Sequence, residues 1–356
     1  MRVYFIVYLL TLLLCFIPVH NKKGYLWKLF IVLIPLFLFG ALREQFNDQS
    51  QYEFCFNEVQ ELSSFIYDED AHHEIGFQWL CYVLPDFRTL LVLSSALMCF
   101  SIGVFFYKNV PPKSLLLAVS LLFLCGNFSI FFILASIRNG LVISVFILTF
   151  SLWQDRRIIP ALGVAVLASL IHTSALFALP LAFVVCRNKR FSINELYIWI
   201  AVILFFIFSS ATALNDYIEP IMSNYFNRYD SVIEASRETG NTFHPMAIIG
   251  SSLMFSLLSY FALQEKQLSK NESSIIRIAM LFVIAPLMTA LNARFSQYYS
   301  PFIVAASAII FARSTRFDIK IIYLFLTFAY LSYSFYLWTQ STWFSYAIYH
   351  SVLGSY

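Results

Sequence analysis

Ten apolar runs, each 15 to 21 residues long, constrain this fold more than any other feature of the sequence. They cover residues 2–18, 25–42, 89–107, 114–134, 139–153, 195–213, 246–264, 275–291, 295–312 and 319–339. An α-helix needs ~20 apolar residues to cross a bilayer, and these runs are continuous rather than alternating. They predict an all-α, polytopic integral membrane helical bundle with about ten full spans.

The composition excludes several classes of protein. Only 12% of the residues are charged, against about 25% in ordinary soluble domains. A chain that is 60% hydrophobic would leave large apolar patches exposed in water, so we exclude a soluble enzyme, a disordered chain and a nucleic-acid-binding protein. Since no repeat, low-complexity tract or linker divides the sequence, we expect a single membrane domain over 1–356.

The distribution of basic residues predicts the orientation. Of the 23 Lys and Arg residues, 16 fall in alternate connecting segments, which the positive-inside rule places in the cytoplasm. The other seven are Arg2, Arg43, Arg88, Arg138, Arg228, Arg237 and Arg294. Most acidic residues also lie on their side, which predicts extracytoplasmic loops at 43–88 and 214–245 and places both termini outside.

Residues 158–186 are too long for one ordinary span, and basic residues flank both ends. A single crossing would leave one basic cluster on the wrong side. We therefore predict a broken helical hairpin whose two short arms meet near His172-Thr173-Ser174, below the outer surface. A broken helix at that depth requires surrounding protein or a water-filled cavity, so we expect a cavity there.

Two outer segments have apolar residues at helical spacing: 48–66 and 217–233. The first suggests a helix on the outer interface, and the second suggests a lid. Plain interfacial packing explains both equally well.

Six polar residues share one level near the outer surface. They are Arg43, Asp48, Glu74, Arg138, His172 and Arg294. Taken singly, such an arginine is more often an interfacial anchor, the histidine a packing residue, and the acids solvated. Anchoring arginines would, however, favour the cytoplasmic side. Their convergence beside a helix break therefore indicates a functional site.

The chemistry of these side chains suggests a substrate class. Arginine forks bind phosphate oxygens through paired hydrogen bonds, and a histidine accepts a proton near neutral pH. Together they predict binding of an anionic lipid diphosphate and activation of a hydroxyl nucleophile. We expect no cofactor and no metal, because phosphate-loop, dinucleotide-binding and zinc-protease motifs are absent. The adjacent pair His72-His73, although near acids, does not easily converge on one ion.

Of the six cysteines, Cys55 and Cys81 lie away from the spans in the expected oxidising compartment. The sequence leaves open whether they form a disulfide bond.

Five segments carry a resemblance to a known family. In order, they are LREQFNDQSQYEFCFNEV, HHEIGFQWL, SIRNGLVISVFILTFSLWQDRR, LASLIHTSALFALPLAF and ARFSQYYSPFI. The chain resembles the EpsG family of exopolysaccharide membrane proteins, which is similar to Wzy-type O-antigen and capsule polymerases. The family pattern maps onto Arg43, Asp48 and Tyr52, and then onto Glu74, Arg138, His172 and Arg294.

The resemblance implies a C-type glycosyltransferase in the bacterial inner membrane that polymerises polyprenyl-diphosphate-linked oligosaccharide repeat units with inversion. We expect Arg138 and Arg294, with Arg43, to bind the diphosphate. His172 would act as general base, while Asp48 or Glu74 would orient the acceptor hydroxyl or serve as base instead.

The expected partners are an undecaprenyl-diphosphate-linked donor and acceptor, membrane lipid, a flippase and a chain-length regulator, with no nucleic acid. Two alternatives stay open: a membrane O-acyltransferase that modifies surface glycans, and a lipid-linked oligosaccharide transporter. A transporter would more often show paired helix breaks in two halves.

Overall fold

The computed structural model describes the chain except for residues 1, 20, 45–48, 62–63, 68–72, 126–135, 155–157, 174, 176–188, 212–244, 266–267, 285–291, 340–349, 352–353 and 356. The chain divides into two compact units. Unit 1 comprises Met1–Pro180, Ser307–Ala312 and Phe328–Tyr356, and unit 2 comprises Leu181–Ala306 and Arg313–Thr327. That the whole chain forms a single membrane domain stays a prediction.

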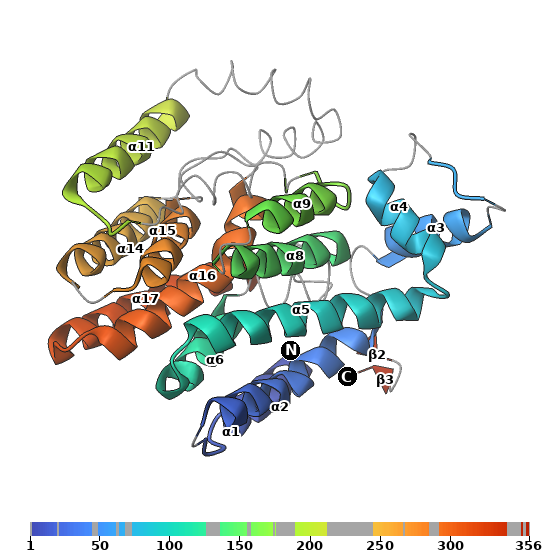
Figure 1. Cartoon of the computed structure of the whole chain (residues 1–356), viewed down its shortest axis with the longest axis horizontal. Coiled ribbons are helices and arrows are strands. Elements are labelled where there is room, and N and C mark those ends of the chain that lie inside the picture. The colour runs from blue at the N-terminus through green and yellow to red at the C-terminus, as the bar shows by residue number, and fades with distance from the viewer. Residues whose placement is uncertain are drawn as a thin grey trace. The chain divides into compact units, whose positions relative to one another are not determined.

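Unit 1 holds the N-terminal helices. They are α1 (Arg2–Leu14), α2 (Lys22–Ala41), α3 (Gln49–Gln60), α4 (Ile75–Val83), α5 (Phe87–Asn109), the short 3-10 helix η1 (Pro112–Ser114), α6 (Leu115–Leu124), α8 (Ile137–Gln154) and α9 (Ile158–Ser169). Side-chain caps fix where α2 and α5 begin: the Asn21 side chain accepts from the Gly24 N–H, and the Asp86 side chain accepts from the Thr89 N–H, both at 2.7 Å. In Figure 1, α9 lies beside α8, α8 beside α5 and α5 beside α2.

A small antiparallel sheet connects the end of α2 to the C-terminal part of the chain. Its strands are β1 (Arg43–Glu44), β2 (His350–Ser351) and β3 (Gly354–Ser355). Arg43 pairs with Ser351 and Glu44 pairs with His350. The guanidinium of Arg88 stabilises this corner, donating to the carbonyl oxygens of Ala41 and Arg43 and to the Glu44 carboxylate.

Unit 2 contains α11 (Ile193–Ala211), α14 (Pro245–Gln264), α15 (Lys270–Ile284) and parts of α16 (Asn292–Arg313) and α17 (Phe317–Thr339). Arg277 on α15 is fully buried and forms a forked ion pair with Glu195 on α11, at 2.5 Å (Nε to Oε1) and 2.9 Å (Nη2 to Oε2). Because a forked pair restricts both side chains, it joins these helices at a defined position.

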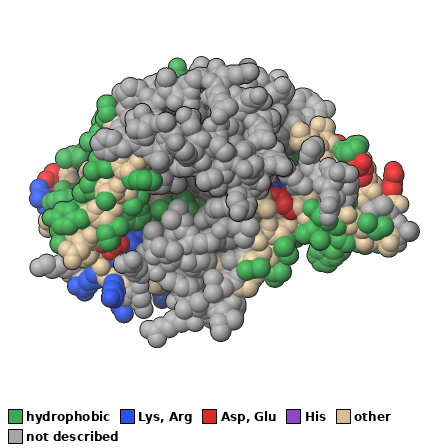
Figure 2. Space-filling view, turned by 90° about the horizontal axis from the view of Figure 1, so that it is seen from above, with side chains coloured by type: hydrophobic (Ala, Val, Ile, Leu, Met, Phe, Trp, Pro, Cys, Tyr) green, Lys and Arg blue, Asp and Glu red, His purple; other side chains and the backbone are tan. Residues whose placement is uncertain are grey.

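Every predicted span overlaps a helix of the described chain, although residues 126–134 and 285–291 of two spans lie outside the described residues; these helices confirm the all-α class. Two of these helices, α2 and α5, are long and apolar enough to cross a bilayer by length and composition. That all ten segments cross a bilayer stays a prediction. The outward stripe on α2 is apolar: Trp27, Phe30, Ile34 and Leu38 are exposed at spacings of three or four residues. Hydrophobic side chains also cover much of the described surface in Figure 2.

In the segment 158–186, where we predict a broken hairpin, the structure shows one helix that ends before His172; the hairpin itself stays a prediction. Helix α9 ends at Ser169, and residues 170–173 form turns rather than a continuing helix. Most of the second arm lies outside the described residues, as does the segment 217–233. The cavity expected at the break stays a prediction.

The helix expected within 48–66 is present as α3, but its apolar face packs against protein. Helices α3, α4, α5 and α8 build one buried cluster. Its members are Tyr52, Cys55, Phe56, Val59, Phe77, Cys81, Leu90, Leu91, Ile137 and Leu141.

Candidate functional site

The first residue of the site is Glu74, which directly precedes α4. The carbonyl oxygen of Glu74 accepts from the N–H groups of Phe77 and Gln78 at 3.0 and 3.1 Å, which starts the helix. Glu74 has an extended backbone, and its side chain makes no capping hydrogen bond. Its carboxylate is directed instead toward the break after α9.

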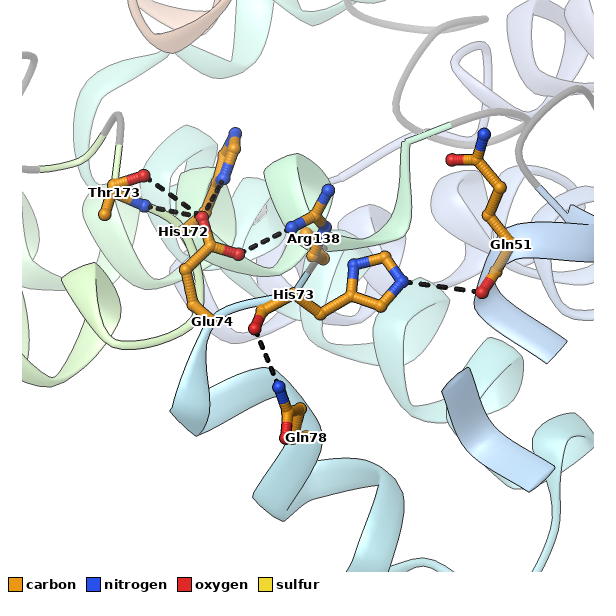
Figure 3. Close-up of polar contacts among 7 residues, drawn as sticks. All are labelled: Gln51, His73, Glu74, Gln78, Arg138, His172 and Thr173. Atoms are coloured by element: carbon orange, nitrogen blue, oxygen red, sulfur yellow. Dashed lines mark hydrogen bonds and ion pairs between the residues drawn. The ribbon is translucent and has the colours of Figure 1, made fainter. Parts of the chain in front are cut away.

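The Glu74 carboxylate accepts hydrogen bonds from two other segments of the chain (Figure 3). Its Oε1 accepts from His172 Nδ1 at 2.9 Å, and from the Thr173 N–H and hydroxyl, both at 3.1 Å. Its Oε2 accepts from Arg138 Nη1 at 2.5 Å. Glu74 and His172 are largely shielded, with side chains 11% and 6% exposed. We call Glu74, Arg138, His172 and Thr173 the carboxylate cluster.

The surroundings of Glu74 keep it ionised. Burial favours the protonated acid, but the hydrogen bond from His172, the charges of Arg138 and His172 and the Thr173 N–H outweigh it. Together they hold the pKa of Glu74 well below its usual value. An ionised carboxylate only accepts hydrogen bonds, so His172 Nδ1 carries a proton. In the neutral imidazole the accepting lone pair is then on Nε2, which points away from Glu74 (Figure 3).

Arg138 is positioned by aromatic rings as well as by Glu74. It lies in the first turn of α8, and its guanidinium carbon is 5.9 Å from the ring centre of Tyr52 and 5.8 Å from that of Phe77. Cation–π contacts of this kind add to the ion pair and fix the plane of the fork. The side chain as a whole is 20% exposed, while its Nε atom is buried.

A close backbone approach brings α4 to the helix break. The Gly76 N–H donates to the carbonyl oxygen of Leu170 at 2.8 Å. A Cβ atom on Gly76 would lie only 2.7 Å from that oxygen. Glycine at this position is therefore what allows Glu74 to reach His172 and Thr173.

His73 belongs to the scaffold of the site. Its ring stacks on Tyr52 with centroids 5.8 Å apart, and its Nε2 is 3.4 Å from the carbonyl oxygen of Gln51. The Gln78 side chain donates to the His73 carbonyl oxygen at 2.9 Å. His72 and the neighbouring acids 68–70 lie outside the described residues. Across the described part of the chain, no three His, Cys, Asp or Glu side chains form a group that could hold a metal ion.

Three of the six predicted site residues come together: Glu74, Arg138 and His172. Arg43 lies on β1 with only 1% of its surface exposed. Asp48 lies outside the described residues, and Arg294 is on α16 with a side chain that the structure does not describe.

Sequence reasoning did not assign Thr173, Gly76 or Phe77 to the site. The position of Thr173, directly after His172 at the predicted break, could have indicated that it belongs to the site. Gly76 is the one glycine in the segment EIGFQWL, and an isolated glycine within a helix is a signal of close packing.

A model of the EpsG family matches residues 25–351, nearly the whole chain. The chain belongs to the EpsG family. EpsG proteins are membrane proteins associated with exopolysaccharide, so this member is a membrane protein related to polysaccharide biosynthesis. The matched range includes every residue of the carboxylate cluster. No curated protein and no solved structure matches the chain.

Proposed function

We propose that this EpsG-family protein polymerises polyprenyl-diphosphate-linked oligosaccharide repeat units by an inverting glycosyl transfer. The observation that carries the proposal is the contact between Glu74 and His172 beside Arg138. It combines an oriented base with an ordered cation, which are the two groups that this reaction requires. The proposed donor is a repeat-unit chain on undecaprenyl diphosphate, and the proposed acceptor is a second lipid-linked repeat unit.

His172 is the proposed general base. Its Nε2 takes the proton of the acceptor hydroxyl while the oxygen attacks the anomeric carbon of the donor sugar. Glu74 keeps Nδ1 protonated and stabilises the imidazolium that forms, as a carboxylate does beside other catalytic histidines. Glu74 is a poor base itself because four donors already satisfy its carboxylate. Between His172 and Glu74, these contacts support His172 as the base, while Asp48 lies outside the described residues.

Arg138 is the proposed ligand of the leaving group. Its guanidinium stays charged at any relevant pH, and its planar fork matches the geometry of phosphate oxygens. As the bond between the anomeric carbon and the phosphate oxygen breaks, negative charge grows on the lipid diphosphate, and Arg138 stabilises it. The proposal that Arg294 and Arg43 also bind the diphosphate rests on the sequence alone, since the Arg294 side chain is not described and only 1% of Arg43 is exposed.

The proposed location is the extracytoplasmic face of a bacterial inner membrane, with both termini outside. The excess of Lys and Arg in the opposite connecting segments supports this orientation. A repeat unit that has been flipped outward presents its diphosphate at this depth. A flippase and a chain-length regulator are proposed partners, because supply of the substrate and control of product length lie outside this chemistry.

The test measures lipid-linked intermediates by mass in a strain whose own copy of the gene is deleted. Complementation with His172→Ala or Arg138→Ala should leave single lipid-linked repeat units to accumulate, with normal amounts of protein in the membrane. Arg316→Ala is the matched control, because Arg316 is exposed and pairs with Asp318, and it should restore long polymer. Long polymer from both site variants would overturn the proposal, and truncated repeat units in the deletion strain would indicate a single-sugar transferase instead.

A further inference from the structure

Helices α3 and α4 lie side by side, and contacts at both ends fix their register. Toward their N-terminal ends, the rings of Tyr52 and Phe77 have centroids 5.5 Å apart. Toward their C-terminal ends, the Gln60 side chain donates to the carbonyl oxygens of Cys81 and Leu84, each at 2.7 Å. The two helices therefore run in the same general direction.

This register places two cysteines opposite each other. Cys55 lies three residues after Tyr52, and Cys81 lies four residues after Phe77, so each is one turn further along the contacting face. Both belong to the same buried cluster, with 3% and 0% of their surface exposed. The Cys55 thiol raises the pKa of Cys81 chiefly through a side-chain hydrogen bond, which requires the sulfurs to be neighbours. In the structure both residues are thiols.

We propose that Cys55 and Cys81 are joined by a disulfide bond in the protein as it matures in the cell. The inference rests on the proposed orientation, which puts α3 and α4 on the oxidising, extracytoplasmic side. In this step the two thiols lose two electrons and two protons as the sulfur–sulfur bond forms. The oxidant is a protein disulfide, which accepts the electrons and protons and becomes a pair of thiols.

The bond would act on the two helices that hold the carboxylate cluster. Helix α3 carries Tyr52, whose ring lies beside the Arg138 guanidinium, and α4 carries Phe77 and follows directly after Glu74. A disulfide bond between Cys55 and Cys81 would close a loop of the chain that includes the acidic segment between α3 and α4. It therefore restricts the unfolded chain and keeps both sides of the site together.

The sequence allows a direct test on the full-length protein. Membranes are quenched in acid, the protein is denatured, and thiols are alkylated without prior reduction. Trypsin then releases Glu44–Arg88 as one peptide, because no Lys or Arg lies between Arg43 and Arg88. Cleavage after glutamates separates the peptides 54–58 and 75–88, which only a disulfide bond would hold together.

The expected result is a linked pair of peptides with neither cysteine alkylated, which reduction separates. Cys15, Cys99 and Cys125 serve as internal controls and should be alkylated. Alkylation of both Cys55 and Cys81 without reduction would overturn the proposal. The outcome is independent of turnover, because the linkage should persist in the inactive His172→Ala variant, so failure of the disulfide and failure of the proposed function are distinguishable.

A second measurement tests whether the bond stabilises the protein. A reductant should lower the midpoint of thermal unfolding of the wild type and leave the double variant Cys55→Ala/Cys81→Ala unchanged. Equal midpoints of the wild type with and without reductant, under conditions that separate the two peptides, would contradict the proposed effect on stability.

Discussion

The backbone N–H of Gly76 donates to the carbonyl oxygen of Leu170 at 2.8 Å, and this contact positions the carboxylate cluster. It joins the first turn of α4 to the break after α9. Two residues earlier, Glu74 contacts His172 and Thr173 from the same break. The chemistry that we propose therefore depends on how closely two backbones approach.

The first prediction concerns Gly76→Ala. A Cβ at this position would lie 2.7 Å from the Leu170 oxygen and 2.8 Å from its carbonyl carbon, which are backbone atoms that cannot rotate away. We expect α4 to shift, with a loss of about 1–3 kcal/mol in the free energy of unfolding. Because Glu74 would move away from His172, polymer should shorten to single repeat units. Thermal unfolding and the mass of lipid-linked intermediates measure the two effects.

Gly163→Ala is the matched control for this substitution. Gly163 lies on α9, and a Cβ added there would meet nothing within 4 Å. Alanine favours the helical state over glycine by about 1 kcal/mol, so stability should stay equal or rise and polymer length should not change. If both glycine variants lost stability and polymer length equally, the close backbone approach at Gly76 would not be the cause of these losses.

The second prediction concerns Glu74→Gln, which retains the shape of the side chain and removes its charge. The amide no longer stabilises an imidazolium at His172 and places an N–H group where a carboxylate oxygen accepts from a donor. We expect the rate of polymerisation to fall by roughly 10²–10⁴-fold. An assay of polyprenyl diphosphate release by purified protein measures this rate. The control is Glu53→Gln: Glu53 is on the neighbouring helix α3, and in the described contacts it is hydrogen-bonded only to Gln49, so this variant should retain wild-type turnover.

The third prediction is a pH dependence of stability. The pKa of Glu74 in the folded protein lies below its usual value of 4.5. A carboxyl group of this kind stabilises the folded state above its unfolded pKa, and this contribution is lost as the pH falls toward the folded pKa. The wild type should therefore unfold at a higher temperature than Glu74→Gln at pH 7, and the difference should decrease below about pH 5. A difference that grows on acidification would contradict the proposed ionisation of Glu74.

The sequence predicted the elements of this site better than their contacts. Apolar runs located the helices, and the basic residues flanking 158–186 located the break at His172, because both patterns are local. The contact between Glu74 and His172 joins residues 98 positions apart. Hydropathy and residue spacing do not predict a contact over such a separation. Glu74 follows an acidic stretch that made it resemble a solvated loop residue. Its role depends on α4, a nine-residue helix too short to be recognised as a span.

The last prediction concerns the buried ion pair in unit 2. Arg277 is fully buried, and its guanidinium is bound by both carboxylate oxygens of Glu195 and lies 5.8 Å from the ring centre of Phe191. Arg277→Met would leave the Glu195 charge without this partner in a largely apolar setting. Breaking a buried pair costs about 3–5 kcal/mol, whereas replacing both members by apolar residues is often close to neutral. Arg277→Met alone should therefore lower the midpoint of thermal unfolding strongly, and Arg277→Met/Glu195→Leu should recover most of the loss. A double variant no more stable than the single one would show that the pair contributes through more than charge compensation.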